Sequence, residues 1–364
     1  MKTLHVEMGR HRLGGTMQVF YLLRGLGQRS VDAALVCPEG SPLQRLAEAE
    51  GIEVFAVPYR GDLDLSFVFR LWRIVRRHQP DITHIHSRRG ADTLGLLGAW
   101  LASRGRVIVS RRVDNPLPRN LVTRLRYAIL PDHVVAVSKG IRRVLLDAGV
   151  PAAQVSQVYS AVEASSYQSA LTREAARARL GLDAQAEVIV VIAQLIPRKG
   201  HRFLLEAVPE LLARHPGLQV LFVGDGELRG VLAADVAARG LGNVVHLLGY
   251  REDVADILRA ADLLVHPATM EGFANVAMQA MAAGIPVVSS AVGGMPESVR
   301  DGENGFLVPP ADPVALAAAI GRLLGDPVLR QRLGARGRAI VETELTVDAM
   351  VQGNLAVYER LLAS

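Results

Sequence analysis

Apolar positions along the chain follow two periods that alternate from one end to the other. Short runs such as residues 187–195 (EVIVVIAQL) have the continuous apolar character of strands buried in a parallel sheet. Segments between them, such as 16–26, carry apolar residues at helical spacing. This alternation predicts an α/β fold. The expected strands, some with the loop that follows, lie in 3–8, 31–37, 54–57, 81–89, 106–110, 132–138, 155–163, 187–195, 219–226, 244–249, 262–266 and 287–290.

Capping residues delimit the helices. Ser41 before Pro42, and Asp326 before Pro327, have the residue types preferred at the N-cap and at the first helical position. Gly284 lies where a helix C-terminal glycine is expected. The expected helices cover 16–26, 41–50, 67–77, 139–146, 202–213, 254–261, 273–283, 313–324, 327–341 and 346–362.

The segment 266–297 (HPATMEGFANVAMQAMAAGIPVVSSAVGGMPE) is the most informative motif. A strand that ends before Pro267 is followed by a glycine turn, a helix rich in Ala and Met, a second strand and another glycine turn. Free N–H groups at the start of that helix would form an anion site suited to a diphosphate, and Glu271 stands just ahead of it. The expected donors are Gly272, Phe273, Ala274 and Asn275.

This segment resembles the signature of the family 4 retaining glycosyltransferases, which have the GT-B fold. In that family a Glu, seven residues and a second Glu lie in a segment like EGF…EAMACGxPVV, followed by GGxxE. The resemblance implies that Glu271 contacts the donor sugar and that position 279 contacts the nucleotide ribose. The second Glu is Gln279 here, which can still bond ribose hydroxyls but loses the charge-assisted strength.

Two domains are expected, because 364 residues exceed one ordinary hydrophobic core. The resemblance implies two Rossmann-like domains that face a central cleft. The N-terminal, acceptor-binding domain would span 1–161, and the nucleotide-sugar donor domain 162–345. The last helix, about 346–364, would cross back to pack on the N-terminal domain.

Residues 193–200 (AQLIPRKG) resemble a second family pattern, Gly-Arg-Leu, three residues and Lys-Gly. Lys199 matches the lysine that neutralises the donor diphosphate in the family. Gln194 replaces the usual arginine, and Arg198 could compensate for the lost charge.

The resemblance assigns roles to five further positions. His86 ends a strand (DITHIH) where the family has a histidine that faces the donor sugar, and a protonated ring would add positive charge there. Gly15 precedes a helix, in a loop that approaches the donor phosphates and acceptor in the family; a simple tight turn is the alternative. Gly224 would allow close approach to the ligand, and Tyr250-Arg251 lie at the nucleobase position.

Positive charge is concentrated in the first half of the chain. Residues 1–160 contain 23 Lys and Arg against 13 Asp and Glu, a net +10, whereas the remainder has 18 against 23, a net −5. This asymmetry predicts an anionic partner: an anionic glycolipid or saccharide acceptor, together with contact between the protein and an anionic membrane. Few aromatic residues accompany the arginines, so nucleic acid is not expected.

Two arginine pairs follow strand-like runs, where a parallel sheet lines its binding crevice. Guanidinium groups there would bind a phosphorylated or carboxylated acceptor, and solvated loop charge is the alternative. The helix at 67–77 combines arginines with large apolar residues, as either a membrane-surface face or an ordinary surface helix would. The candidate acceptor ligands are Arg88, Arg89, Arg111 and Arg112.

No cofactor or metal is expected. The single cysteine, Cys37, ends an apolar run typical of the core, which excludes an internal disulfide and a Cys-based metal site. Asp62 and Asp64 have the Asp-x-Asp spacing of metal-dependent sugar transferases, but they lie just before a helix, where a loop or capping role is favoured. Residues 1–10 lack the apolar stretch of a signal peptide, so a cytoplasmic location, extending to the inner face of the membrane, is expected.

The function expected from the resemblance is retaining, metal-independent transfer of a hexose-type sugar from a nucleotide sugar, with a UDP-sugar favoured. The acceptor would be a cell-envelope glycolipid or polysaccharide, as in lipopolysaccharide or exopolysaccharide biosynthesis. Glu271, His86 and Lys199 are the expected catalytic residues. The alternatives are a nucleotide-sugar 2-epimerase and an inactive nucleotide-sugar-binding subunit, the latter because Gln194 and Gln279 each replace a charged residue.

Overall fold

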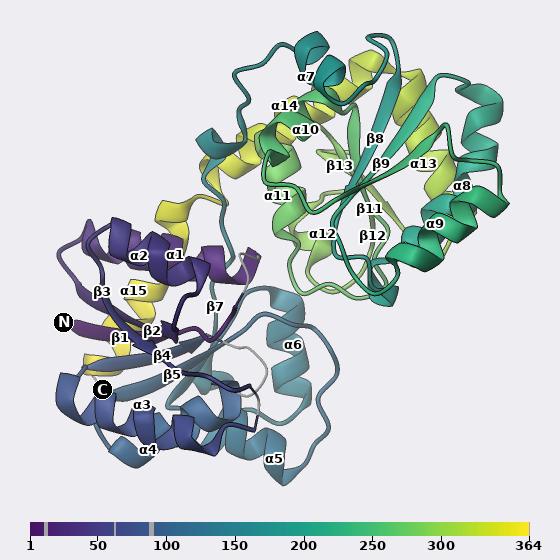
Figure 1. Ribbon diagram of the computed structural model, residues 1–364. Coiled ribbons are helices and arrows are strands. Elements are labelled where there is room, and N and C mark those ends of the chain that lie inside the picture. The colour runs from purple at the N-terminus through teal and green to yellow at the C-terminus, as the bar shows by residue number, and fades with distance from the viewer. Residues whose placement is uncertain (11–13, 62, 87–90, 364) are drawn as a thin grey trace. The chain divides into compact units, whose positions relative to one another are not determined.

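The computed structural model describes residues 1–10, 14–61, 63–86 and 91–363, which form two compact units (Figure 1). The N-terminal unit contains Met1–Ala161 and Val347–Ser364, and the C-terminal unit contains Val162–Thr346. The last helix therefore belongs to the N-terminal unit, as the resemblance implied. None of the helices in the described ranges is long and apolar enough to cross a membrane.

The N-terminal unit contains a sheet of seven parallel strands in the order β3-β2-β1-β4-β5-β6-β7. Its central strands are buried on both faces, as expected of a parallel sheet covered by helices, although β1 and β4 also bury threonines and histidines. Each expected strand is present, although the one predicted over 155–163 is limited to three residues. The strands are β1 Lys2–Val6, β2 Asp32–Pro38, β3 Glu53–Val57, β4 Ile82–His86, β5 Arg106–Arg111, β6 His133–Ala136 and β7 Val155–Gln157.

Helices cover both faces of this sheet, with α1, α2 and α15 on one side and α3, α4 and α5 on the other (Figure 1). Helix α2 begins as predicted, because the Ser41 hydroxyl accepts a hydrogen bond from the backbone N–H of Gln44. Helices α4 and α5 were not predicted. The helical segments are α1 Gly14–Gly27, α2 Pro42–Ala49, α3 Leu65–His78, η1 Ala91–Gly95, α4 Leu96–Ala102, α5 Leu121–Arg124, η2 Leu125–Ile129, α6 Lys139–Asp147, η3 Ala152–Gln154 and α15 Val347–Ala363.

The returning helix α15 is held by close packing and by hydrogen bonds. A Cβ atom at Gly25 of α1 would lie 2.4 Å from Cγ2 of Val351, so these two helices approach more closely than any larger residue would allow. At the other end of α15, the Tyr358 hydroxyl lies 2.6 Å from Nδ1 of His84. The C-terminal helix is thus an integral layer of the N-terminal unit.

The C-terminal unit contains a sheet of six parallel strands in the order β10-β9-β8-β11-β12-β13. A continuous apolar core joins these strands to α8, α9 and α13 on one face. The strands are β8 Glu187–Ile192, β9 Leu218–Val223, β10 Val245–Gly249, β11 Leu263–His266, β12 Val287–Ser290 and β13 Gly305–Val308. The helical segments are η4 Ala164–Tyr167, α7 Arg173–Arg179, η5 Pro197–Lys199, α8 His201–Arg214, α9 Arg229–Ala238, α10 Val254–Ala260, α11 Asn275–Ala282, α12 Met295–Ser298, α13 Pro313–Gly325 and α14 Pro327–Thr343.

Each sheet has a topological switch point, where the strand order reverses. It lies between β1 and β4 in the N-terminal unit and between β8 and β11 in the C-terminal unit. Open α/β sheets bind ligands just beyond the carboxyl ends of the strands at such points. We therefore expect the functional residues among the polar residues that follow these four strands.

Candidate functional site

The loops after β8 and β11 bring two of the predicted catalytic residues into contact. Gly200 has φ +72°, and a Cβ there would lie 1.9 Å from the carbonyl oxygen of Pro267, so the two loops lie directly against each other. Lys199, one residue earlier, forms an ion pair through its Nζ with Oε2 of Glu271. Both side chains are 13% exposed, which leaves the pair accessible at the surface of the switch point.

A histidine completes this cluster. Nε2 of His266, the last residue of β11, lies 2.9 Å from the same Oε2 of Glu271. Burial raises the pKa of the Glu271 carboxyl, but the hydrogen bond from His266 and the charge of Lys199 outweigh burial and hold that pKa well below its usual range. Burial also lowers the pKa of His266, so the ring is neutral and donates through Nε2–H. The carboxylate is therefore an anion at every physiological pH.

The sequence reasoning missed His266 and its buried neighbour His201. Burial, with smaller contributions from His266 and Lys199, lowers the pKa of His201 to about 4. Within the described ranges, neither ring nitrogen of His201 has a hydrogen-bond partner, nor does Nδ1 of His266. The available signal was positional: His266 ends a strand five residues before Glu271, and His201 follows Lys199-Gly200.

Helix α11 begins at Asn275, two residues later than the predicted start at 273. Ala274 is the N-cap and has extended backbone angles, so Ala274 and Phe273 lie ahead of the first turn. The carbonyl of Glu271 accepts a hydrogen bond from Gly294 N–H at 3.2 Å, which holds Glu271 and the adjacent Gly272 against the second glycine turn. Of the four expected donors, only Asn275 is thus a residue of the helix.

Two predicted polar positions follow the start of α11. Within the described residues, the buried Oδ1 of Asn275 has no hydrogen-bond partner. Gln279 is half-buried. It lies four residues further along the helix, so its Cα is about one turn, roughly 6 Å, from that of Asn275. A ligand hydroxyl at this end of the helix would satisfy the amide oxygen.

The other predicted donor-binding residues of this unit lie on the loops around this cluster. Nη1 of Arg198 is 3.4 Å from the carbonyl oxygen of Met270, which places its guanidinium beside the loop that carries Glu271. Gln194 is exposed on the loop after β8. Tyr250 is 57% exposed beyond β10, and Arg251 donates through Nε to Asp253 Oδ1 at 2.8 Å.

Gly224 allows a close approach within the chain itself. With φ +141°, its position would place a Cβ 2.0 Å from the carbonyl oxygen of Ala193, so a larger residue would not fit against this backbone. The predicted approach to a ligand stays a prediction. The N–H of Gly224 donates to the Gly249 carbonyl at 2.8 Å. Gly224 thereby joins the loops that follow β8, β9 and β10.

Substitution of Gly224 by alanine is expected to destabilise the C-terminal unit by about 1–3 kcal/mol, because alanine is strained at this φ and clashes with a fixed carbonyl. The measurement is urea unfolding of the full chain followed by circular dichroism. Gly217→Ala is the matched control, since no other atom lies within 4 Å of a Cβ at that position. Equal stability of the two variants would contradict the assignment.

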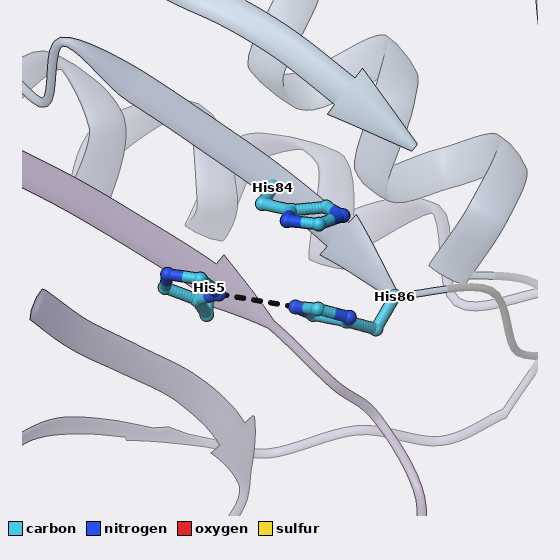
Figure 2. Close-up of side chains that lie close together, drawn as sticks. All are labelled: His5, His84 and His86. Atoms are coloured by element: carbon cyan, nitrogen blue, oxygen red, sulfur yellow. Dashed lines mark hydrogen bonds between the residues drawn. The ribbon is translucent and has the colours of Figure 1, made fainter. Parts of the chain in front are cut away.

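In the N-terminal unit, three histidines of β1 and β4 form a buried array (Figure 2). His5 pairs in register with His84, and His86 lies two residues further along β4, so all three side chains leave the same face of the sheet. None is exposed to solvent. Nδ1 of His5 lies 3.1 Å from Nε2 of His86, and the rings of His84 and His86 stack with centroids 4.2 Å apart.

Arg112 sets the direction of the hydrogen bonds in this array. A guanidinium can only donate, so Nδ1 of His86, 3.2 Å from Nη2 of Arg112, must accept. The proton of His86 then resides on Nε2 and is donated to Nδ1 of His5. His5 in turn carries its proton on Nε2, 3.2 Å from Oγ1 of Thr3. The chain of donors runs from Arg112 through His86 and His5 to Thr3.

The surroundings of His86 disfavour the protonated ring that the sequence analysis considered. Burial, followed by the neighbouring His84, Arg112 and His5, lowers the pKa of His86 well below its ordinary value. Burial likewise lowers the pKa of His84, and that of His5 falls to about 3. The positive charge at this switch point belongs to Arg112, whose pKa of about 10, lowered by burial, still leaves it charged at neutral pH.

The ring nitrogens of His5, His84 and His86 lie within 4.8 Å of one another, close enough to consider a metal ion. The arrangement fits hydrogen bonding better. Stacked rings such as those of His84 and His86 direct their in-plane lone pairs side by side instead of toward one point. The nitrogens of His84 also have partners, at 2.6 Å to the Tyr358 hydroxyl and 2.8 Å to the Ser110 hydroxyl.

The predicted acceptor arginines separate into different classes. Arg111 is 2% exposed, donates to the Tyr127 hydroxyl at 2.8 Å and lies over that ring, so its predicted acceptor role is wrong and its role is structural. Arg112 lies at the switch point, and a Cβ at Gly15 would be 3.8 Å from its Cδ, so the first turn of α1, which contains Gly15 instead of a preceding loop, lies beside it. Arg88 and Arg89 lie outside the described residues.

Asp64, the second aspartate of the Asp-x-Asp segment, has a structural role. Asp64 accepts hydrogen bonds from Ser66 Oγ at 2.5 Å, Arg60 N–H at 2.9 Å and Arg70 Nη2 at 2.6 Å. Its carboxylate is therefore held by the loop and by helix α3. Asp62 lies outside the described residues.

Family models match both units. The family described as Glycosyltransferase Family 4 matches residues 14–166, and the one described as Glycosyl transferases group 1 matches residues 172–340. The lipopolysaccharide core biosynthesis glycosyltransferase LpsE of Rhizobium meliloti is 28% identical over 100% of this chain and 99% of its own length. A D-inositol 3-phosphate glycosyltransferase of Streptomyces griseus is 42% identical over 46% of this chain, which spans only 38% of that protein.

Solved structures share the fold. Anabaena Alr3699/HepE, solved in complex with UDP, has a TM-score of 0.86 with 22% identity over 99% of this chain and 100% of that one. WaaG, a glycosyltransferase involved in lipopolysaccharide biosynthesis, has a TM-score of 0.75 with 17% identity over 97% of this chain and 99% of its own. With two Rossmann-like units and family matches over both, the chain belongs to the family 4 glycosyltransferases, enzymes of the GT-B fold.

Proposed function

We propose that this glycosyltransferase takes a sugar from a nucleotide donor, with a UDP-sugar favoured, and transfers it with retention of anomeric configuration. No metal or cofactor is required. The observation that carries the proposal is the cluster of Lys199, Glu271 and His266 at the β8/β11 switch point. The donor preference is supported by HepE, which shares the fold and has been crystallised with UDP-glucose.

The chemistry demands stabilisation of two opposite charges. As the bond from the anomeric carbon to the diphosphate oxygen breaks, its electron pair leaves with the diphosphate, which Lys199 stabilises. The sugar becomes electron-poor, and the fixed anion of Glu271 orients its hydroxyls. The acceptor oxygen bonds to the anomeric carbon on the face from which the diphosphate departs, and its proton passes to a diphosphate oxygen. The carboxylate acts by position and charge, because its pKa is too low for proton transfer.

Donor binding changes the partner of Lys199. In the free protein the ammonium is neutralised by Glu271. A diphosphate competes for that ammonium, and the sugar then supplies hydroxyl donors to the carboxylate. His266 keeps Glu271 in place during this exchange, since its Nε2–H bond is independent of the lysine. The ion pair therefore holds the Lys199 ammonium and the Glu271 carboxylate in the positions in which they bind the donor.

The acceptor is an anionic glycolipid or saccharide of the cell envelope, glycosylated at the cytoplasmic side. Arg112 supplies the positive charge at the β1/β4 switch point, and the neutral His86 contributes position instead of charge. The name of LpsE, which aligns over its whole length, supports an acceptor of the lipopolysaccharide type. The transferred group is of the hexosyl type.

A panel of UDP, GDP, ADP and their common sugar conjugates tests the donor site by thermal shift. A ligand at a hundredfold excess over its dissociation constant stabilises the native protein by about 2.7 kcal/mol. One nucleotide should shift the melting curve, and the shift should disappear in Lys199→Ala. No shift with any nucleotide would overturn the proposal. Binding without release of nucleoside diphosphate, across lipid and saccharide acceptors, would favour the inactive binding subunit.

Glu271→Gln is expected to lower the transfer rate by about a hundredfold while raising the affinity for UDP. The rate falls because a fixed negative charge beside the electron-poor sugar is lost. The affinity rises because Lys199 no longer has an anionic partner inside the protein. Calorimetric titration with UDP and a UDP-release assay measure the two effects. Weaker UDP binding in this variant would contradict the competition between Glu271 and the diphosphate.

A further inference from the structure

Exposed apolar side chains are concentrated in one part of the N-terminal unit. Among the described residues, ten of the sixteen exposed large apolar side chains lie between positions 63 and 129. Phe69 of α3 is 58% exposed and Trp100 of α4 is 47% exposed, and Leu101, Leu121, Val122 and Ile129 are exposed as well. A clustering of this kind marks an interaction surface, whereas isolated exposed apolar residues need no explanation.

The helices that carry these residues form one continuous face, the docking face, made of α3, α4, α5 and η2. Helices α3 and α4 are in direct contact, because a Cβ at Gly98 would lie 2.8 Å from the Val68 carbonyl oxygen. Arg126 of η2 donates to Oγ1 of Thr93 in η1, which runs into α4, at 2.5 Å. All lie on the sheet face opposite α1, α2 and α15 (Figure 1).

The docking face is strongly basic. Its four helices contain six arginines and no carboxylate, and the exposed Arg119 lies just before α5. The nearest carboxylates in sequence, Asp64 and Asp92, are buried and lie within ion-pair distance of Arg70 and Arg126. Exposed arginines therefore alternate with exposed apolar side chains and have few acidic neighbours.

We propose that the docking face binds the surface of an anionic membrane. Its arginines meet lipid phosphates, while Trp100, Leu101 and the Leu121-Val122 pair enter the boundary between headgroups and acyl chains. Arginines alone would suit any polyanion, but the interleaved large apolar side chains need a partner that offers apolar contact as well. The inference rests on the proposed function in one respect: docking on the membrane brings the protein to the lipid layer that holds a glycolipid acceptor.

Tryptophan fluorescence tests the contact directly. The chain has two tryptophans, Trp72 and Trp100, so a Trp72→Phe variant reports only from the docking face. The probes are vesicles of phosphatidylcholine with 30% phosphatidylglycerol, and vesicles of phosphatidylcholine alone, each with and without brominated chains. The expected result is a blue shift with bromine quenching on the anionic vesicles at low salt, weakening as salt is added. No quenching on the anionic vesicles would overturn the proposal.

Paired variants separate charge from apolar contact. Arg119→Gln with Arg124→Gln should weaken partitioning about 25-fold, at about fivefold for each arginine near an anionic surface. Leu121→Ser with Val122→Ser should weaken vesicle binding, whereas Val314→Ser with Val328→Ser, exposed in the C-terminal unit, should not. Vesicle binding unaffected by the first two pairs would overturn the proposal, as would tighter binding to duplex DNA than to vesicles. The vesicle assays contain no nucleotide sugar, so their outcome does not depend on whether the protein is a transferase.

Discussion

Replacing Lys199 with alanine should reduce kcat/KM for glycosyl transfer by about 10²–10³-fold, the usual cost of removing one fixed group that stabilises a developing anion. The leaving diphosphate gains negative charge in the transition state, and Lys199 is the ammonium at the β8/β11 switch point. Release of UDP from the preferred UDP-sugar, with and without acceptor, measures the loss. Lys139→Ala, an exposed lysine of the N-terminal unit, is the matched control and should leave the rate unchanged.

The double variant Lys199→Ala with Glu271→Gln distinguishes electrostatic catalysis from simple loss of structure. Glu271→Gln alone should tighten UDP binding, and that gain should vanish when Lys199 is also absent, because the gain comes from freeing the ammonium. Residues in one ion pair are expected to be non-additive in this way. If the gain in UDP affinity persisted without Lys199, the ion pair would have no part in donor binding.

The sequence motifs identified Lys199 and Glu271 separately, but not their contact. The contact joins residues 72 positions apart in sequence. It depends on β8 and β11 being neighbours in the sheet and on Gly200 lying against the Pro267 carbonyl. His266 contributes to the same cluster without a motif of its own. Periodicity predicts which segments are strands, whereas the order of strands decides which loops meet.

The start of α11 and the role of Arg111 show a second limit of the sequence reasoning. Helix-forming composition continues through Phe273 and Ala274, but Ala274 has the extended backbone angles of an N-cap, so both residues lie ahead of the first turn. Arg111 and Arg112 are adjacent in sequence and point to different surroundings, since consecutive residues of an extended chain leave opposite faces of the sheet. Arg111 reaches Tyr127, and Arg112 reaches His86.

The charge of His86 could not be predicted from its position at the end of a strand. Protonation depends on how completely the ring is removed from water and on which groups surround it. The sequence shows the His-x-His spacing of β4, but not that His5 of β1 is its register neighbour or that Tyr358 arrives from the last helix. These contacts join positions more than 75 residues apart, and together they keep the array neutral.

The buried array should make the N-terminal unit sensitive to mild acid. A histidine that stays neutral when folded and takes a proton when unfolded costs about 1.4 kcal/mol of stability per pH unit below its unfolded pKa of about 6.5. His5, His84 and His86 all have native pKa values below that value, so their contribution is complete above pH 6.5 and is lost as pH falls. Together they should lower the free energy of unfolding by about 4 kcal/mol between pH 7 and pH 5.5.

Urea unfolding followed by tryptophan fluorescence measures this loss, because both Trp72 and Trp100 lie in the N-terminal unit. His5→Gln keeps an amide that can accept from His86 and donate to Thr3, and it removes one titrating group, so the pH slope should fall by about 1.4 kcal/mol per pH unit. Tyr358→Phe deletes a hydrogen bond to His84 without removing a histidine, and its curve should lie below that of the wild type with the same slope. If His5→Gln kept the full slope, His5 would be taking up a proton in the native state, and the one-way hydrogen-bond chain from Arg112 to Thr3 would be wrong, because a protonated His5 could not accept from His86.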